Sequence, residues 1–514
     1  MSKARLLLVG IVWLVILGLG VGAWKFFFAD EVSAKQAEEE RVAREEAAAR
    51  EAEARRRGGA DSRYKTAVTI NLDAFSGYAV LRSDPFKDAL RESEIRLELV
   101  DDGADYPARL DALAKGTADM AVFTIDALVK ASAQAGALPA TIVAVIDEST
   151  GADAILGAKA TLQNVAALND PQTRFVVVPD SPSETLARVV MSRFDLDRLG
   201  EDPFVRADSA ADVFARYKQS KPADRLAFVL WEPYVTQTLK NPAMHVLADS
   251  GEFPAAIVDV LVASDDFVAK SPEVVSEVLR SYFVANHAYG NDSARVTLVQ
   301  EDAEKLGEPL SDEEAARLVD GIWWKNTPEN LAHMGIAPDR GVTHVEDIID
   351  AVTDVLLESG GIADDPTGGR PNYLFNTAVW SPLADFRPRG YIERIRGRRL
   401  PKLSDEQWQT LSPAGIARAP KLSFARGTAR LTSRSQVLMD EMIGRLNSTR
   451  YYVRVEGNAD ARGDAEANRR LAEARAKTVE AYLRENGVDA NRVRAEVGEV
   501  GRGTSVTFVL GVPR

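Results

Sequence analysis

The amino-acid sequence predicts a mixed α/β protein built from several separate parts. The chain has 514 residues, which is too long for one hydrophobic core, so we expect two to four domains. Its first part is an uncharged apolar stretch of helical length. A long middle part alternates short apolar runs with helix-like patterns, which is typical of a mostly parallel sheet with helices on both faces. A short C-terminal part repeats strand and helix patterns on a smaller scale, as in a compact α+β domain.

The composition excludes several kinds of chemistry. The sequence has no cysteine, so disulfides, thiolate metal sites and a cysteine nucleophile are excluded. No two of its four histidines are spaced four residues apart, which argues against a histidine metal site or a catalytic triad. The net charge of −14 argues against nucleic acid as a partner. We therefore expect no metal and no cofactor.

Residues 1–29 are predicted to form a cytoplasmic tip and a transmembrane signal anchor. Leu6–Trp24 is a stretch of 19 residues without a charge, and as a helix it would span about 28 Å, close to the hydrocarbon thickness of a bilayer. A cleaved signal peptide is the alternative, because Val21–Ala23 offers small residues at a cleavage position. Both interpretations place the rest of the chain outside the cytoplasm. The stretch contains no Asp, Glu, His or Arg, so it carries no ion relay.

Residues 30–63 are predicted to be a charged helical stalk. They are rich in Glu, Arg and Ala, which favour helix and pair at i, i+3 and i, i+4. Apolar residues at coiled-coil positions are nearly absent. A solvated stalk that ends at Gly58-Gly59 is therefore the better interpretation, and a weak dimer zipper is the alternative.

Residues 64–361 are predicted to form one α/β domain. Strand-like runs such as "AVTINLDAF", "IRLELVDD" and "ATIVAVIDES" alternate with helical patterns such as "PARLDALAKG". In open α/β sheets, ligands bind beyond the C-terminal ends of strands, where helix N-termini present free N–H groups. Seven residues at such positions are candidates for binding a small polar or anionic solute: Phe75, Ser76, Gly77, Thr124, Ser181, Ser183 and Trp231. The alternative is that Ser181 and Ser183 cap a helix and that Trp231 is a core residue.

This middle part resembles the type 2 periplasmic binding proteins of the nitrate/sulfonate/taurine class of ABC transporters. The resemblance is carried by "DESTGADAILG", "VPDSPSETL", "WEPYVTQTL" and "VLVASDDFVAKSPEVVSEVLRSYFVANHAY". It implies two doubly wound α/β lobes that are joined by a hinge and close on a ligand. The crossings between lobes are expected near Val178 and near Val258–Leu261. It also implies ligand contacts from Phe75, Ser76, Gly77, Ser181 and Ser183. A related branch uses a cysteine-rich motif for catalysis, and the absence of cysteine argues against that enzyme activity.

Residues 362–420 are predicted to be a connector. They are rich in Pro, Gly and Arg and have little regular periodicity, so we expect a linker that is partly docked on the binding domain.

Residues 421–514 contain an aspartate and a helix-borne arginine that together raise the question of a ligand. The run "YYVRVEGNAD" predicts a strand that ends at Asp460, and a helix stopped by Gly487 follows. Asn468, Leu471, Arg475, Val479 and Tyr482 recur at helical spacing, which places Arg475 on an apolar, inward stripe. A buried arginine needs an anion. Asp460 is either the partner of Arg475 in an ion pair or its partner in a ligand clamp.

This segment resembles the OmpA-like peptidoglycan-binding domain. The motifs are "F-x-x-G-x-A-x-L", "V-x-G-N-A-D-x-R-G" and "N-x-x-L-x-x-x-R-A-x-x-V-x-x-Y-L", which together cover nearly all of residues 421–510. The resemblance implies a βαβαββ domain. In it Arg475 takes a carboxylate of diaminopimelate, Asp460 receives the ammonium end, and Asn468 lies near the site. The chain departs from the family at Asn458-Ala459, where His-Thr is usual, at Ala472, where a serine is common, and after Glu499, where it is shortened.

Together these features predict a non-enzymatic protein of a Gram-negative-type envelope. We expect a single-pass inner-membrane anchor with its N-terminus in the cytoplasm and the bulk of the chain in the periplasm. One domain would bind a solute and another would bind peptidoglycan. The protein would act as a tethered receptor or sensor, or as a transport-associated binding protein with an envelope or transporter partner. The alternative is a structural tether whose binding fold no longer takes a ligand. A stator-like ion-driven unit is disfavoured, because the span has no acidic residue.

Overall fold

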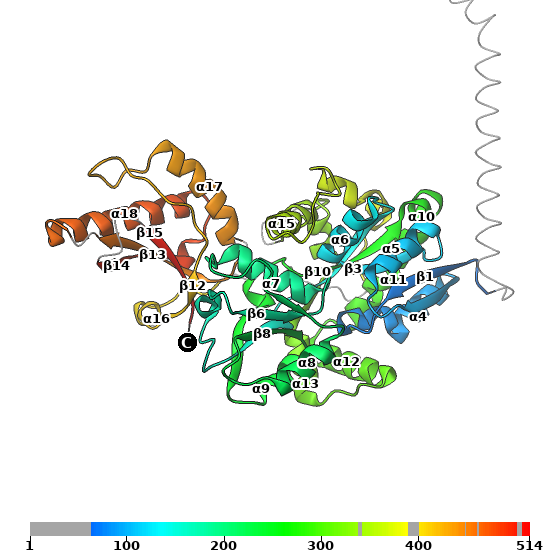
Figure 1. Ribbon diagram of the computed structural model, residues 1–514. Helices are drawn as coiled ribbons and strands as arrows, with labels where there is room; N and C mark the ends of the chain where they lie inside the picture. Colours follow the sequence, from blue (N-terminus) through cyan, green and yellow to red (C-terminus); the bar gives the residue numbers. More distant parts are fainter. Residues whose placement is uncertain are drawn as a thin grey trace, which may run out of the picture. The chain divides into compact units, whose positions relative to one another are not determined.

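The computed structural model describes residues 63–337, 342–388, 400–447, 449–459, 462–500 and 506–513 (Figure 1). The expected membrane span and nearly all of the expected stalk lie outside these residues. Within the described ranges, no helix is both long enough and apolar enough to cross a bilayer.

The first sheet has six strands, in the spatial order β11-β4-β10-β3-β1-β2. β1 and β3 are parallel, whereas β10 runs antiparallel to both of its neighbours. Its strands are β1 (Thr66–Leu72), β2 (Ile95–Asp101), β3 (Met120–Thr124), β4 (Ala140–Ser149), β10 (Val258–Ser264) and β11 (Ile322–Trp324). Every residue of β3, β4 and β10 is buried. Burial on both faces explains why these strands read as continuous apolar runs in the sequence.

The second sheet has five strands, in the order β7-β6-β8-β5-β9. Its strands are β5 (Asp153–Ala158), β6 (Arg174–Val177), β7 (Phe204–Arg206), β8 (Leu226–Trp231) and β9 (Met244–Asp249). Alternate residues of β8 enter two separate hydrophobic clusters. Ala227 and Val229 pack with α7 (Pro182–Arg193), and Phe228 and Leu230 pack with α8 (Ala210–Gln219). Helices therefore cover both faces of this sheet (Figure 1).

The remaining helices alternate with these strands or follow them in the chain. They are α3 (Ala79–Arg82), α4 (Asp84–Glu92), α5 (Tyr106–Lys115), α6 (Ile125–Ala135), α9 (Tyr234–Leu239), α10 (Asp265–Lys270), α11 (Pro272–Ala288), α12 (Asp292–Leu306), α13 (Asp312–Gly321), α14 (Thr327–His333) and α15 (Val345–Glu358). Their ends follow local chemistry. For example, Asp105 caps the start of α5, and Gly116 ends it with a φ of +69°.

The chain passes between the two sheets twice, and we call the part around the first sheet the first lobe and the part around the second sheet the second lobe. The first passage lies between β4 and β5, and the second between β9 and β10. The second agrees with the expectation near Val258. The first does not, because Val178 directly follows β6 inside the second lobe. β5 and β10 are the strands that follow the two passages. Each of them runs antiparallel to both of its neighbours in its sheet. Each sheet is consequently mixed and not mostly parallel.

Part of the expected connector packs on the first lobe. Two short 3-10 helices lie at Pro371–Leu374 and Ala378–Leu383. Trp380 is fully buried, and its Nε1 donates to the carbonyl oxygen of Val143 over 2.7 Å. Burial of this indole explains why a segment without periodicity is nevertheless ordered.

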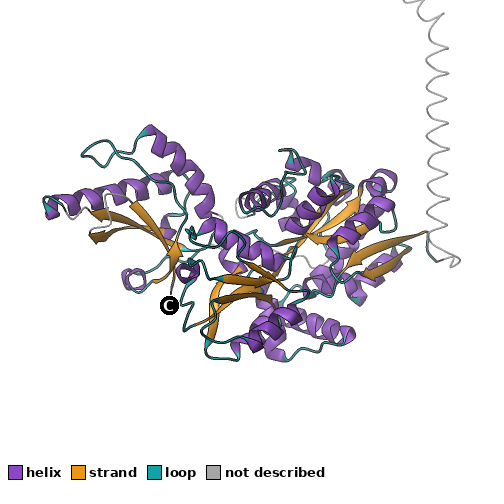
Figure 2. Ribbon diagram, viewed as in Figure 1, coloured by secondary structure: helices purple, strands orange, loops and turns teal. Residues whose placement is uncertain are grey.

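The C-terminal sheet has four strands, in the order β12-β15-β13-β14. They are β12 (Ser412–Ile416), β13 (Tyr452–Ala459), β14 (Val493–Val500) and β15 (Val506–Val512). α17 (Ser433–Asn447) and α18 (Ala465–Glu485) lie together on one face (Figure 2), and the short α16 (Asp405–Gln409) precedes β12.

The element order is βαβαββ, as the OmpA resemblance implies, but its first strand differs from the expected one. β12 pairs with β15, so the sheet begins before residue 421. The run Leu422–Phe424 forms only an isolated bridge, from Phe424 to Leu431. β12 contains a proline and a glycine, which obscure its strand pattern in the sequence.

Candidate functional site

Four side chains lie side by side across the first sheet. Asp259 of β10 is directly opposite Thr124 of β3 on one side and Asp147 of β4 on the other, and Asp147 is opposite Trp324 of β11. Directly opposite residues project on the same face of a sheet, with their Cβ atoms about 4.5–5.5 Å apart. We call these four residues the carboxyl row. Asp147, Asp259 and Thr124 are at most 2% exposed.

The turn after β1 lies against this row. A short 3-10 helix, Ser76–Tyr78, follows the half-buried Phe75. A Cβ on Gly77 would lie 2.4 Å from the Phe75 ring and 2.5 Å from Asp147 Oδ2, so both groups meet where glycine has no side chain. Trp324 Nε1 donates to the Gly77 carbonyl oxygen over 2.8 Å. The turn expected from the sequence is therefore part of the same site as the carboxyl row.

The two carboxyl groups of the row strongly perturb one another. Burial raises the pKa of Asp147 to about 7, and burial together with the charge of Asp147 raises the pKa of Asp259 well above its ordinary value. The two side chains are close enough for one to donate a shared proton to the other. The Tyr78 hydroxyl also donates to Asp259, and burial followed by that charge raises the pKa of Tyr78.

Several buried hydroxyl groups have no hydrogen-bond partner among the described residues. Among them are those of Thr124 in the carboxyl row, Ser183 at the start of α7 and Tyr282 on α11. An unsatisfied buried hydroxyl costs stability, so each is a candidate for contact with a ligand or water. The Ser183 side chain makes no cap bond, which argues against the capping alternative for this residue.

The other two predicted residues of the second lobe have structural contacts. Ser181 precedes α7, but its hydroxyl donates to the Val178 carbonyl oxygen over 2.7 Å and makes no cap bond to the helix. Trp231 is half-buried and packs against the hydrophobic cluster that contains Phe228 and Leu230. This packing favours the core interpretation of Trp231.

A polar contact also links α6 of the first lobe to α7 of the second. The Thr185 hydroxyl donates to Asp126, and Lys130 Nζ lies 3.2 Å from the same hydroxyl and 3.8 Å from Glu184. Asp153, at the start of β5, accepts from Ser149 over 2.6 Å, and burial raises the pKa of Asp153 to about 7. Acidic side chains thus also lie where the two lobes meet, on α6, on α7 and at the start of β5.

Sequence reasoning missed the acids of this region, although a signal for them was present. Asp147 and Asp259 interrupt the apolar runs "VAVIDES" and "IVDVLVAS". A strand buried on both faces buries any charged residue in it, whichever face it points to.

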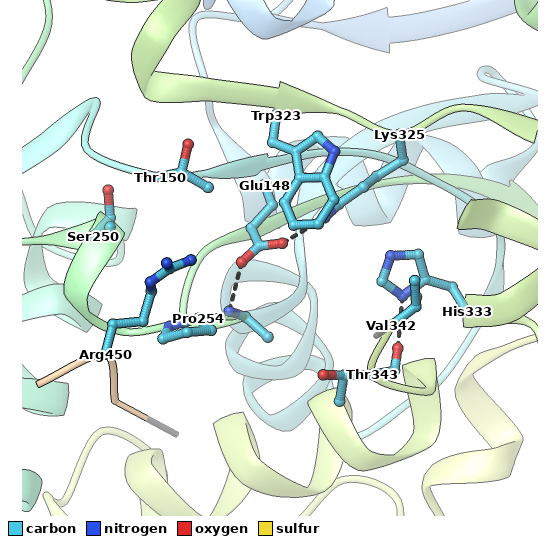
Figure 3. Close-up of a pocket in the computed structure, with 12 residues that line it drawn as sticks. Glu148, Thr150, Ser250, Pro254, Trp323, Lys325, His333, Val342, Thr343 and Arg450 are labelled. Carbon is cyan, nitrogen blue, oxygen red and sulfur yellow. Dashed lines mark hydrogen bonds and ion pairs between the residues drawn. The ribbon is translucent and has the colours of Figure 1, made fainter. Parts of the chain in front are cut away.

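A separate cavity of about 110 Å³ lies near the end of β4 (Figure 3). Glu148 forms an ion pair with Lys325, whose Nζ lies 3.3 Å from the centre of the Trp323 ring. His333 Nδ1 lies 2.7 Å from the Thr343 carbonyl oxygen, and burial lowers the pKa of His333 to about 3, so the ring is neutral. These groups are mostly paired with one another, in contrast to the hydroxyls of the other site. The described residues contain no group of three or more His, Asp or Glu side chains placed to hold a metal ion.

In the C-terminal domain, the structure places Arg475 and Asn468 on α18, whereas Asp460 lies outside the described residues. Arg475 is half-buried, not inward-facing, because the buried side of α18 consists of Ala472, Ala476, Val479 and Leu483. Its Nε donates to the Thr428 carbonyl oxygen over 3.2 Å, and its guanidinium lies 4.9 Å from the centre of the Phe424 ring. The side chain is therefore held at the edge of the helix, where a ligand can reach it.

Two further polar residues of this domain have defined contacts. Asn468 Nδ2 donates to the Arg462 carbonyl oxygen over 2.6 Å. Asn458, one of the departures from the family motif, is buried and donates to Thr507 Oγ1 over 2.8 Å. Asn458 therefore joins β13 to β15.

Comparisons with known proteins give one family match and several similar solved structures. Residues 423–506 match the OmpA family. Among solved structures, the chain is similar to the periplasmic aliphatic sulphonate binding protein of Escherichia coli, with 18% identity and a TM-score of 0.45, over 66% of this chain and 98% of that one.

Two further solved structures show a similar degree of likeness. A putative sulfonate-binding protein of Methylobacillus flagellatus KT has 13% identity and a TM-score of 0.47, over 62% of this chain and 94% of that one. The nitrate-binding protein of Synechocystis PCC 6803 has 11% identity and a TM-score of 0.46, over 62% and 88%. No curated protein matches the sequence significantly. The chain thus joins a larger α/β part with two sheets to a C-terminal domain that matches the OmpA family over residues 423–506.

Proposed function

We propose that this protein is an envelope receptor that binds a small polar solute in its two-lobed part and peptidoglycan through its C-terminal domain. The observation that carries the proposal is the presence of both folds in one chain, each with polar groups placed for a ligand. In the first lobe these are the hydroxyls and carboxyls around the carboxyl row. In the C-terminal domain it is Arg475, held by Phe424 and Thr428.

The roles of the C-terminal residues come from the family resemblance. Arg475 would bind a carboxylate of the diaminopimelate stem, with Asp460 at the ammonium end and Asn468 nearby. The N-terminal segment would anchor the protein in the inner membrane, with these domains in the periplasm. Two attachment points would hold the receptor in place, and closure of the lobes on a solute would be the signal passed to a membrane or envelope partner.

A screen of the purified full-length protein against small solutes tests the receptor role. A ligand that binds only the folded protein raises its melting temperature, by an amount that corresponds to about 2.7 kcal/mol at a hundred-fold excess over Kd. We expect such a shift for at least one polar solute, and we expect it to shrink in Phe75→Ala, because Phe75 lies against Asp147 beside Gly77. A Ser181→Ala variant is the matched control, because the Ser181 hydroxyl is bonded to Val178. No shift with any solute would favour the structural tether.

A further inference from the structure

Two carboxyl groups lie at the centre of the candidate solute site, and their charge bears on the charge of the ligand. Asp147 and Asp259 lie next to each other at the centre of the carboxyl row, almost without exposure to solvent. Within the described part of the chain, no hydroxyl or N–H group donates to either oxygen of Asp147. Its close contact is with the carboxyl group of Asp259. Two adjacent buried carboxyl groups are unfavourable when both are charged, unless a proton or another cation lies between them.

The cations near the row each have contacts of their own, and Lys325 and Arg295 also lower the pKa of Asp147. Lys325 is paired with Glu148, and Arg109 is paired with Asp73 and Asp102. Arg295 donates to Asn286 Oδ1, and its guanidinium lies 4.6 Å from the centre of the Trp324 ring. An anionic solute at the row would meet two adjacent buried carboxyl groups.

Two further hydroxyl groups can accept hydrogen bonds from an ammonium group of a ligand. Thr124 is in the row itself, directly opposite Asp259, and its buried hydroxyl has no partner in the described residues. The buried Tyr282 hydroxyl has none either, and its pKa is raised by burial and then by the charge of Asp147. Each hydroxyl can accept a hydrogen bond from an ammonium group. The Phe75 ring, beside Gly77, adds an aromatic surface, which attracts cations through the face of the ring.

We propose that the first lobe binds the protonated amine of a small organic solute, with Asp147 and Asp259 as its counterions and Thr124 and Tyr282 as further acceptors. The ammonium group replaces the proton that the two carboxyls otherwise share. This inference rests on the proposed solute-binding function and specifies the chemical class of the solute. It differs from the names of the similar solved structures, which refer to sulfonates and nitrate.

The proposal predicts a defined pH dependence. Ionisable groups that act on Asp147 come from every neighbouring element: Asp259 on β10, Lys325 after β11, Arg295 on α12, Asp153 on β5 and Tyr282 on α11. Because the pKa of Asp147 is about 7, the amine must displace a proton below that pH. Affinity for an amine is expected to fall about tenfold between pH 8 and pH 6, while the amine itself remains protonated.

Calorimetry on the full-length protein in mild detergent tests this, with butylamine and 1,4-diaminobutane compared against butanesulfonate and nitrate at pH 8. Butylamine and butanesulfonate share a carbon chain and differ in charge. We expect an amine to bind, and Asp147→Asn to weaken that binding roughly 10- to 100-fold. The control is Asp249→Asn in the second lobe. It removes a half-buried carboxylate but keeps a residue able to cap Ser250–Glu252, and it should leave affinity unchanged.

A second variant separates binding from folding. Tyr282→Phe removes only a hydroxyl without a partner, so it should keep the melting temperature and weaken amine binding roughly two- to tenfold. Binding of butanesulfonate or nitrate with no response to either amine would overturn the inference and leave the solute-binding function standing. Absence of binding by both classes to the folded protein would overturn both. Amine binding that neither Asp147→Asn nor Tyr282→Phe weakens would overturn the assignment to this row.

Discussion

At the scale of single residues, burial decides how each charged side chain is used. Asp147 and Asp259 are fully buried and titrate as a pair, whereas Arg475 is half-buried and held at the edge of α18. Burial lowers the pKa of Arg475, but the guanidinium remains protonated at any physiological pH. A charged group at the edge of a helix remains in contact with water, and a carboxylate of a ligand can replace that water.

Replacement of Arg475 tests the proposed wall contact. Because a guanidinium binds a carboxylate through two parallel hydrogen bonds, Arg475→Ala should lower the fraction of protein that sediments with insoluble peptidoglycan by roughly tenfold. Arg470→Ala is the matched control, since Arg470 lies on the same helix in an exposed pair with Glu466. Equal losses in the two variants would indicate non-specific charge attraction and would contradict a specific site.

At the scale of elements, α18 packs very closely on β13 in the C-terminal domain. A Cβ on Gly457 of β13 would lie 2.0 Å from the Ala472 carbonyl oxygen of α18. Backbone atoms cannot move aside as a flexible side chain can, so only glycine permits this contact. Gly444 in α17 is the opposite case, because nothing lies within 4 Å of its Cβ position.

These two glycines predict opposite effects of the same substitution. Gly457→Ala should destabilise the domain by about 1–3 kcal/mol, because the helix must shift away from the sheet. Gly444→Ala should stabilise it by about 0.5–1 kcal/mol, because alanine favours the helix interior. Thermal unfolding of the two variants beside the parent protein measures both signs. A neutral Gly457→Ala variant would show that α18 does not lie this close to β13.

At the scale of the whole molecule, the buried acids of the two lobes link stability to pH. Asp147 and Asp153 have pKa values of about 7, above the ordinary 3.8, so the folded protein holds protons that the unfolded chain has released. Stability therefore falls as pH rises towards and through 7. His333 acts in the opposite direction below pH 6.5, where the unfolded chain gains a proton that the folded ring does not.

The fall in stability with rising pH is measured best above pH 6.5, the ordinary pKa of histidine, where His333 no longer opposes it. Between pH 6.5 and 8.5 Asp147 and Asp153 alone should lower the free energy of unfolding by about 1–2 kcal/mol, which lowers the melting temperature by a few degrees. Asp153→Asn should flatten this decline, because the amide cannot release a proton. Differential scanning calorimetry at a series of pH values measures it. A melting temperature that rises across this window would mean that these two carboxyls are not buried as described.

The sequence predicts elements whose chemistry is local. In the C-terminal domain, the two helices and the last three strands follow from periodicity, and the OmpA motifs follow from residue spacing along the chain. The turn at Phe75–Gly77 was also predictable, because a strand end followed by a helix start is a local pattern. The first crossing between the lobes was not predictable. The strand that ends before Val178 has the same apolar pattern whether the chain then stays in its lobe or crosses to the other one.

By its own pattern, then, the sequence determined the kinds of elements, their order and the two families that the chain resembles. The tertiary structure decided which residues meet. Asp147 and Asp259 are 112 positions apart in the chain, and only the pairing of β4 with β10 makes them neighbours. It likewise brought β12 into the C-terminal sheet and moved Arg475 from an expected inward stripe to the edge of α18. Contacts between distant strands depend on sheet order and register, and neither is encoded in the periodicity of a single segment.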